Sequence, residues 1–229
     1  MVENPSARGS PSSGIRADLA GKHVLITGVT GFLGTALLER LLADFPETRI
    51  TVLVRGRYGS PPASRLQELL AGNGFRELRA RIGPEGLQRE VVERLEVREG
   101  DVSEDLPELP ADLDVVFHCA AAVSFDPPID HAFKINLLGS TRLYQAVLAS
   151  GSRPHLVHVS TAYVAGMTKG VVPETTLDHR IDWRSESEAA MSARRQVEDA
   201  SRKPEMLDRF MERSRAQHRR AGPIAVATA

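Results

Sequence analysis

Residues 23–45 read HVLITGVTGFLGTALLERLLADF, and this stretch decides the fold. Its first five residues are mostly apolar, too few for a helix and rich in strand formers, so they predict a buried parallel strand. From residue 28 the spacing becomes helical, with five leucines on one side: Leu33, Leu37, Leu38, Leu41 and Leu42. A second apolar run, ITVLV at 50–54, completes a strand–helix–strand unit, whose crossover is almost always right-handed.

Three glycines lie where the first strand meets the helix, in a G-x-x-G-x-x-G spacing. Such glycines permit a tight turn, the approach of a diphosphate to the backbone and close packing of helix on sheet. The unpaired N–H groups and the positive dipole at the helix start favour phosphate. We therefore predict a dinucleotide site made by Gly28, Thr30, Gly31, Phe32, Leu33 and Gly34. The alternative is a plain turn between a strand and a helix.

The end of the second strand indicates which dinucleotide binds. An NAD site typically has a carboxylate there for the ribose hydroxyl, whereas an NADP site has an arginine for the 2′-phosphate. The segment VLVRGRYGS (52–60) contains Arg55 and Arg57, and no acidic residue occurs between 51 and 60. The sequence therefore favours NADP(H), held by these two arginines. The alternative is two solvated arginines at a strand end.

The rest of the chain repeats the alternation of strands and helices. Residues 60–94 predict a helical crossover in pieces, broken by Gly72, Gly74, Gly83 and Pro84. Strands are predicted at 95–101, 114–121 and 155–160, and a long amphipathic helix at 128–150. This order predicts an α/β fold, a Rossmann-type doubly wound parallel sheet with strand order 3-2-1-4-5.

Two further strand ends supply candidate cofactor contacts. Asp101 and Val102 follow the third strand, where we expect them to meet the adenine edge. The alternative for Asp101 is an ordinary turn or helix-capping aspartate. Ala120 and Ala121 end the fourth strand with the small side chains that a closely approaching cofactor requires, although core packing could require the same.

Beyond Pro173 the composition changes. Residues 184–220 are rich in Arg, Glu, Ser and Ala, and Pro204 divides them into two predicted helices. We expect a mobile arm at 1–18, an NADP-binding domain at 19–170, and a loop with a charged helical insertion at 171–229 that forms an incomplete substrate region.

Composition excludes several classes of function. The formal net charge of −1 gives no reason to expect a nucleic-acid partner, and Cys119 is the single cysteine. No apolar run approaches the roughly 20 residues of a membrane span, and the N-terminus does not resemble a secretory signal, so we expect a cytoplasmic protein. Of the seven histidines, His155 and His158 would point to opposite faces of a strand, and we predict no metal site.

Four stretches carry a family resemblance: TGVTGFLGTALLERLL, GDVSEDLPEL, VVFHCAAAVSFDPPIDHAFKINLLGSTRLYQAVL and HLVHVSTAYVAG. They resemble the extended short-chain dehydrogenases/reductases, most closely the fatty acyl-CoA reductase branch, which includes the thioester-reducing domains. The resemblance implies NADPH-dependent reduction of a long-chain acyl-CoA or acyl thioester to an aldehyde, and often to the alcohol. It also implies that Thr161 polarises the carbonyl oxygen, with Ser160 as a second candidate and Asn136 in support.

One part of the family pattern does not occur. The family uses a Tyr-x-x-x-Lys pair, but the three tyrosines, Tyr58, Tyr144 and Tyr163, are followed four residues later by Pro62, Leu148 and Met167. In the relatives the pair follows the charged insertion, so we expect this chain to be a C-terminally truncated, cofactor-binding part. Its fifth strand would then be an open edge, and the chain would be poorly stable or self-associating.

Two other functions stay open at this stage. A nucleotide-sugar epimerase or dehydratase would favour a carboxylate after the second strand and a Tyr-x-x-x-Lys soon after residue 170. A non-catalytic NADP-binding module would use the glycine turn alone. The sequence does not specify acyl-chain length, aldehyde against alcohol as the product, or oligomeric state.

Overall fold

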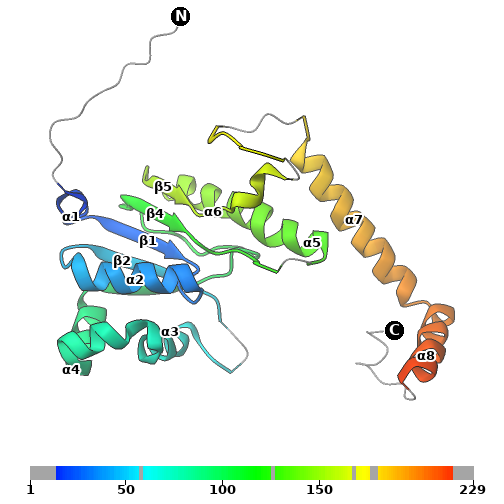
Figure 1. Cartoon of the computed structure of the whole chain (residues 1–229), viewed down its shortest axis with the longest axis horizontal. Helices are drawn as coiled ribbons and strands as arrows, with labels where there is room; N and C mark the ends of the chain where they lie inside the picture. Colours follow the sequence, from blue (N-terminus) through cyan, green and yellow to red (C-terminus); the bar gives the residue numbers. More distant parts are fainter. Residues whose placement is uncertain (1–13, 57–58, 125–126, 167–168, 176–179, 219–229) are drawn as a thin grey trace, which may run out of the picture. The chain divides into compact units, whose positions relative to one another are not determined.

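The sheet is the one predicted. A computed structural model describes residues 14–56, 59–124, 127–166, 169–175 and 180–218 (Figure 1). Five parallel strands form one sheet in the order β3-β2-β1-β4-β5. They are β1 His23–Thr27, β2 Arg49–Val54, β3 Leu95–Glu99, β4 Val115–His118 and β5 His155–His158. The fold is therefore a doubly wound, Rossmann-type α/β sheet.

Helices pack on both faces of this sheet: α2 Phe32–Asp44, α3 Pro62–Ala71 and α4 Arg76–Arg94 on one face and α6 Leu138–Ala149 on the other. The short helix α1 Ile15–Asp18 precedes β1, and α5 Ile129–Ala132 precedes a π-helical segment at Phe133–Leu137. Val24 and Ile26 of β1 pack with α2, α3 and α4, whereas Leu25 packs with Leu143 of α6. Because alternate residues of a strand point to opposite faces, β1 is buried on both sides.

The predicted breaks in the second crossover occur close to where the glycines lie. Helix α3 ends at Ala71, and a 3-10 turn at Asn73–Phe75 leads into α4. Within α4, Gly83 has φ of 73° and Pro84 follows it, so the helix is kinked there. A positive φ suits glycine, and proline cannot supply the helical N–H.

Three strands are shorter than predicted at their carboxyl ends. The strand expected at 114–121 ends at His118, because Cys119 and Ala120 turn across the backbone of Gly28. The strands expected to reach 101 and 160 end at Glu99 and His158. The segments beyond these ends form the loops in which the candidate site lies.

The described residues divide into two compact units. One contains residues up to 124 and 134–172, and the other contains 127–133 and those from 173 onward. The second unit includes α5, α7 Trp183–Ser201 and α8 Pro204–His218, the two charged helices that the proline predicts. Of the predicted arm, residues 1–13 lie outside the described residues and Ile15–Asp18 forms α1. None of the described helices is long and apolar enough to span a membrane.

Candidate functional site

The glycine turn follows β1 and touches the segment after β4. Gly28 has φ of 75°, and a Cβ built there would lie 2.6 Å from the backbone nitrogen of Ala120. At Gly34 a Cβ would lie 2.7 Å from the carbonyl carbon of Gly28. Both glycines are therefore required by close backbone contacts, and the turn is locked to the loop that follows β4.

The start of α2 is suited to a diphosphate. Gly31 is its N-cap, no side chain caps it, and no acidic residue lies in its first turn. Phe32 is 94% exposed and Leu33 48% exposed, so the first turn faces outward from the core. The first N–H groups of a helix have no partner within the helix and attract anions. The predicted residues therefore fit the diphosphate of a dinucleotide.

Arginines lie beside the end of β2. Arg55 is exposed, and its Nη1 lies 3.7 Å from Oδ2 of Asp101. Arg65 of α3 donates a hydrogen bond to the carbonyl oxygen of Arg55 and, with Thr30, lines a cavity of ≈350 Å³. Arg57 lies outside the described residues. The sequence analysis missed Arg65. It lies in the first turn of α3, the helix that follows β2, and the start of such a helix lies near the end of the strand before it.

Asp101 and Val102, which we expected to meet the adenine, make local contacts just after β3. Oδ1 of Asp101 accepts a hydrogen bond from the backbone N–H of Ser103 at 2.9 Å, which is a turn contact. Burial acts to raise the pKa of Asp101, but the hydrogen bonds from Ser103 and the charge of Arg55 outweigh it, and the pKa is lowered. The side chain of Val102 is buried against Gly139 of α6.

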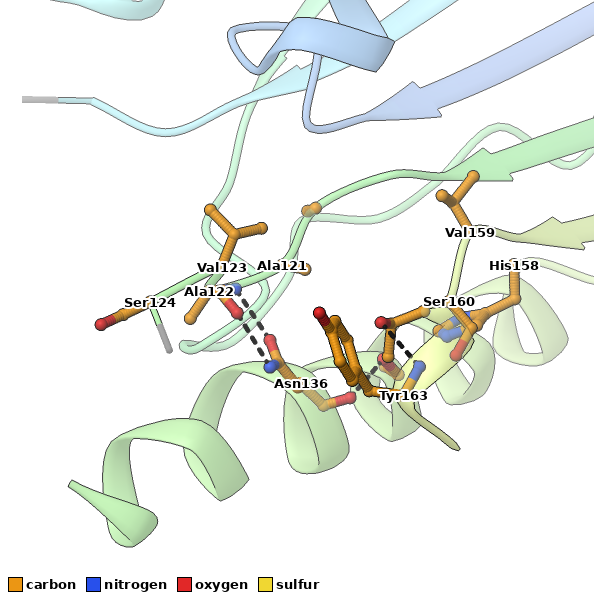
Figure 2. Close-up of a pocket in the computed structure, with 12 residues that line it drawn as sticks. Ala121, Ala122, Val123, Ser124, Asn136, His158, Val159, Ser160 and Tyr163 are labelled. Atoms are coloured by element: carbon orange, nitrogen blue, oxygen red, sulfur yellow. Dashed lines mark hydrogen bonds between the residues drawn. The ribbon is translucent and has the colours of Figure 1, made fainter. Parts of the chain in front are cut away.

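A second cavity, of ≈650 Å³, lies between the loop after β4, helix α6 and the segment after β5 (Figure 2). It brings together the predicted residues Ala120, Ala121, Asn136, Ser160 and Thr161. The other lining residues are Ala122, Val123, Ser124, Ser140, His158, Val159 and Tyr163. Because Ala120 also touches Gly28, this cavity adjoins the glycine turn.

Thr161 is held with its hydroxyl proton available. It is the N-cap of the 3-10 turn Ala162–Ala165, and its Oγ1 accepts a hydrogen bond from the backbone N–H of Tyr163 at 3.2 Å (Figure 2). A hydroxyl that accepts through its oxygen can still donate its proton. Thr161 can therefore donate to an oxygen bound in the cavity.

Asn136 binds backbone. Its Oδ1 accepts from the N–H of Ala122 at 2.8 Å, and its Nδ2 donates to the carbonyl of Ala122 at 3.1 Å (Figure 2). Both halves of the amide are used, which removes the cost of an unpaired polar group. Asn136 thus fixes the loop after β4, which forms one wall of the cavity.

A buried row of polar side chains, missed by sequence reasoning, links the turn to this cavity. His118 bonds through Nδ1 to Oγ1 of Thr27 at 2.7 Å and through Nε2 to Oγ of Ser140 at 2.9 Å. The Ser140 hydroxyl donates to the carbonyl of Asn136, and the oxygen of Thr27 accepts the N–H of Ala120. The sequence did contain a signal for this row, because Thr27 and His118 are polar residues at the ends of two buried strands.

Burial and hydrogen bonding together fix the state of His118. Burial, with a smaller contribution from His158, lowers its pKa to about 4, so His118 is neutral at neutral pH. Since the Ser140 hydroxyl donates elsewhere, it accepts from Nε2–H, and the unprotonated Nδ1 of the neutral ring accepts from Thr27. Among the described residues no group of three His, Cys, Asp or Glu is placed to hold a metal ion.

Comparison with known proteins gives the family. Over residues 26–218 the chain matches the NAD-binding family described as "Male sterility protein". It is 36% identical over 147 residues to fatty acyl-CoA reductase 1 of Xenopus laevis and 33% identical over 158 residues to fatty acyl-CoA reductase 2 of Homo sapiens. These matches cover 62% and 66% of this chain but only 28% and 30% of those reductases.

The fold also has a solved counterpart. A thiolation-reductase di-domain from an archaeal non-ribosomal peptide synthetase superposes with a TM-score of 0.52 at 22% identity, over 76% of this chain and 39% of that one. The glycine turn, the sheet order and the family match agree, and the chain, which is similar to the fatty acyl-CoA reductases, belongs to the male sterility family of NAD-binding domains.

Proposed function

We propose that this chain is the NADP(H)-binding part of a reductase that converts a long-chain fatty acyl-CoA to an aldehyde or alcohol. One observation carries the proposal. Thr161 lines the ≈650 Å³ cavity together with the loop after β4, and that loop touches Gly28 of the glycine turn. The hydroxyl that would bind the carbonyl and the turn that would bind the cofactor therefore lie at one edge of the sheet, where ligands bind in doubly wound folds.

NADP is favoured over NAD by the charges beside β2. Arg55 and Arg65 lie together at the end of this strand, where Arg65 donates a hydrogen bond to the backbone carbonyl of Arg55. The sequence has no carboxylate between 51 and 60 to bind a ribose hydroxyl. A 2′-phosphate would compete with Asp101 for the guanidinium of Arg55, and phosphate forms strong charge-assisted hydrogen bonds with arginine. These features support the 2′-phosphate as ligand.

The chain's own residues would bind and polarise the substrate. The N–H groups at the start of α2 would hold the diphosphate, and the small side chains of Ala120 and Ala121 leave space for the nicotinamide, which supplies a hydride when bound. Thr161 would donate its proton as a hydrogen bond to the thioester carbonyl oxygen, making the carbon more electrophilic.

Calorimetric titration tests the substrate class. Dodecanoyl-CoA is titrated into the chain saturated with NADP⁺, which cannot deliver a hydride, and UDP-glucose is titrated in parallel. We expect the thioester to bind, Thr161→Ala to weaken it about tenfold, and Thr161→Ser to restore it. Thr175→Ala, at an exposed threonine that does not line the cavity, serves as the control.

Each alternative has its own outcome in this experiment. Binding of UDP-glucose but not of the thioester would favour a nucleotide-sugar enzyme. Binding of NADP⁺ with neither substrate would favour a non-catalytic module.

A further inference from the structure

A histidine and a tyrosine outside the predicted site form a pair at the cavity wall. His158 of β5 is in register with His118 of β4, so both side chains lie on the same face of the sheet. The hydroxyl of Tyr144, on α6, lies 2.6 Å from Nδ1 of His158, and the two rings meet edge to face. His158 lines the cavity together with Ser160 and Thr161 (Figure 2).

The contact with Tyr144 suits one tautomer of His158. A phenol keeps its proton at neutral pH, and burial raises the pKa of Tyr144 further, against the smaller opposing effect of a hydrogen bond with Ser140. The hydroxyl can therefore donate to Nδ1, and a neutral imidazole that accepts at Nδ1 carries its proton on Nε2. No residue in the described part of the chain accepts a hydrogen bond from this Nε2–H, which remains available to a ligand.

We propose that His158 is a second hydrogen-bond donor, beside Thr161, for the carbonyl oxygen of the acyl thioester, with Tyr144 as the positioning residue that holds its tautomer. This inference rests on the proposed function. Two donors that converge on one oxygen stabilise negative charge as it develops there.

The reduction balances with both donors neutral. The thioester carbon gains a C–H bond by taking up the hydride of NADPH, and the former C=O electron pair moves onto the oxygen held by Thr161 and His158. The C=O bond then re-forms, the C–S bond breaks, and the thiolate leaves with its electron pair. The acyl carbon is reduced to the aldehyde, NADPH is oxidised to NADP⁺, and His158 keeps its proton throughout.

Nitrogen NMR tests the tautomer without substrate. With ¹⁵N-histidine, at about pH 8 where an ordinary histidine is neutral, we expect His158 to show the Nε2–H form in the wild-type chain. His158→Gln assigns the signal, and Tyr144→Phe should convert it to a mixture of tautomers. An Nδ1–H form in the wild-type chain, or an unchanged signal in Tyr144→Phe, would overturn the proposal.

Thioester binding tests the donor itself. His158→Phe should weaken dodecanoyl-CoA binding to the NADP⁺-saturated chain about tenfold, and His158→Gln, whose amide N–H reaches a similar point, should restore most of it. His155→Phe is the matched control, because His155 is on the same strand but does not line the cavity. With Thr161→Ala the losses should be non-additive, since both donors share one oxygen.

The outcomes separate this inference from the proposed function. A wild-type chain that binds no thioester overturns both. A wild-type chain that binds NADP⁺ and thioester, with His158→Phe binding equally well or with strictly additive losses, overturns the role of His158 alone.

Discussion

His118 links pH to stability at the scale of a single residue. It is 1% exposed, and its pKa falls from 6.5 to about 4 on folding, so the folded protein disfavours its protonation. The unfolded chain binds this proton below about pH 6.5, and the stability that His118 contributes is therefore lost as the pH falls from there toward 4. We expect a loss of about 3 kcal/mol from this group.

Denaturant unfolding between these pH values measures the effect. His118→Gln, which does not titrate, should be less stable at neutral pH but should lack this part of the pH slope. An identical pH slope in the variant and the wild-type chain would contradict a neutral, buried His118.

Gly28 offers a test of the close contact beneath the turn. Gly28 and Gly151 both have positive φ, at 75° and 83°, but a Cβ meets backbone only at Gly28. Replacing Gly151 with alanine should cost about 1 kcal/mol, the cost of the left-handed conformation. Gly28→Ala should cost clearly more and weaken dinucleotide binding. Equal losses of melting temperature would show that the contact with Ala120 is not tight.

Arg94 joins two elements. Its side chain, only 10% exposed, reaches from the last turn of α4 to the end of α2 and donates to the carbonyl oxygens of Phe45 at 2.5 Å and Leu42 at 3.1 Å. Arg94→Ala would remove the donor to the Leu42 carbonyl and one of two donors to the Phe45 carbonyl, which also accepts from the N–H of Thr48 at 3.2 Å, so we expect a loss of about 2 kcal/mol in unfolding free energy. Arg94→Lys should not restore the lost stability, because a lysine ammonium lacks the planar, forked set of N–H donors with which the guanidinium binds two carbonyl oxygens.

An exposed arginine provides the comparison. Arg40 pairs with Asp44 on the surface of α2, where water screens the pair, and Arg40→Ala should leave the unfolding free energy nearly unchanged. A similar loss in both arginine variants would argue against the capping role of Arg94.

The elements differ in how far the sequence predicts them. HVLIT and ITVLV predict β1 and β2 to within a residue, because both faces of these strands are buried and nearly every position is apolar. The end of β4 is overpredicted, because apolar residues continue past His118 while the backbone already turns over Gly28. Tertiary contact, which local pattern does not contain, sets that boundary.

The residue types of the candidate site can be predicted from the sequence, but the hydrogen bonds between its elements cannot. Glycine spacing indicates the turn, and family resemblance indicates Thr161 and Asn136. The bond from His118 to Ser140 depends on strand register and on which face α6 presents. The hydrogen bond from Arg65 to the backbone carbonyl of Arg55 likewise depends on where α3 begins.

At the scale of the molecule, the sheet is open along β5 in the part of the chain that the structure describes. There β5 is an edge strand, three of its four residues are exposed, and Leu156 is 40% exposed. Unpaired strand edges with apolar side chains promote association. We therefore expect the chain to form dimers or larger species in sedimentation, and Leu156→Lys to shift it toward monomer. Ile15→Lys, at an exposed residue of α1, is the control, and a monodisperse wild-type monomer would contradict the expectation.

The central claim, that an NADP(H) site lies at this edge of the sheet, is tested most directly by calorimetric titration of the chain with NADPH and with NADH. We predict that NADPH binds at least about tenfold more tightly, and that the double variant Arg55→Ala, Arg65→Ala removes this preference while Arg76→Ala, at an exposed arginine, leaves it intact. Equal or tighter binding of NADH, or no binding by a chain that melts cooperatively, would contradict the account.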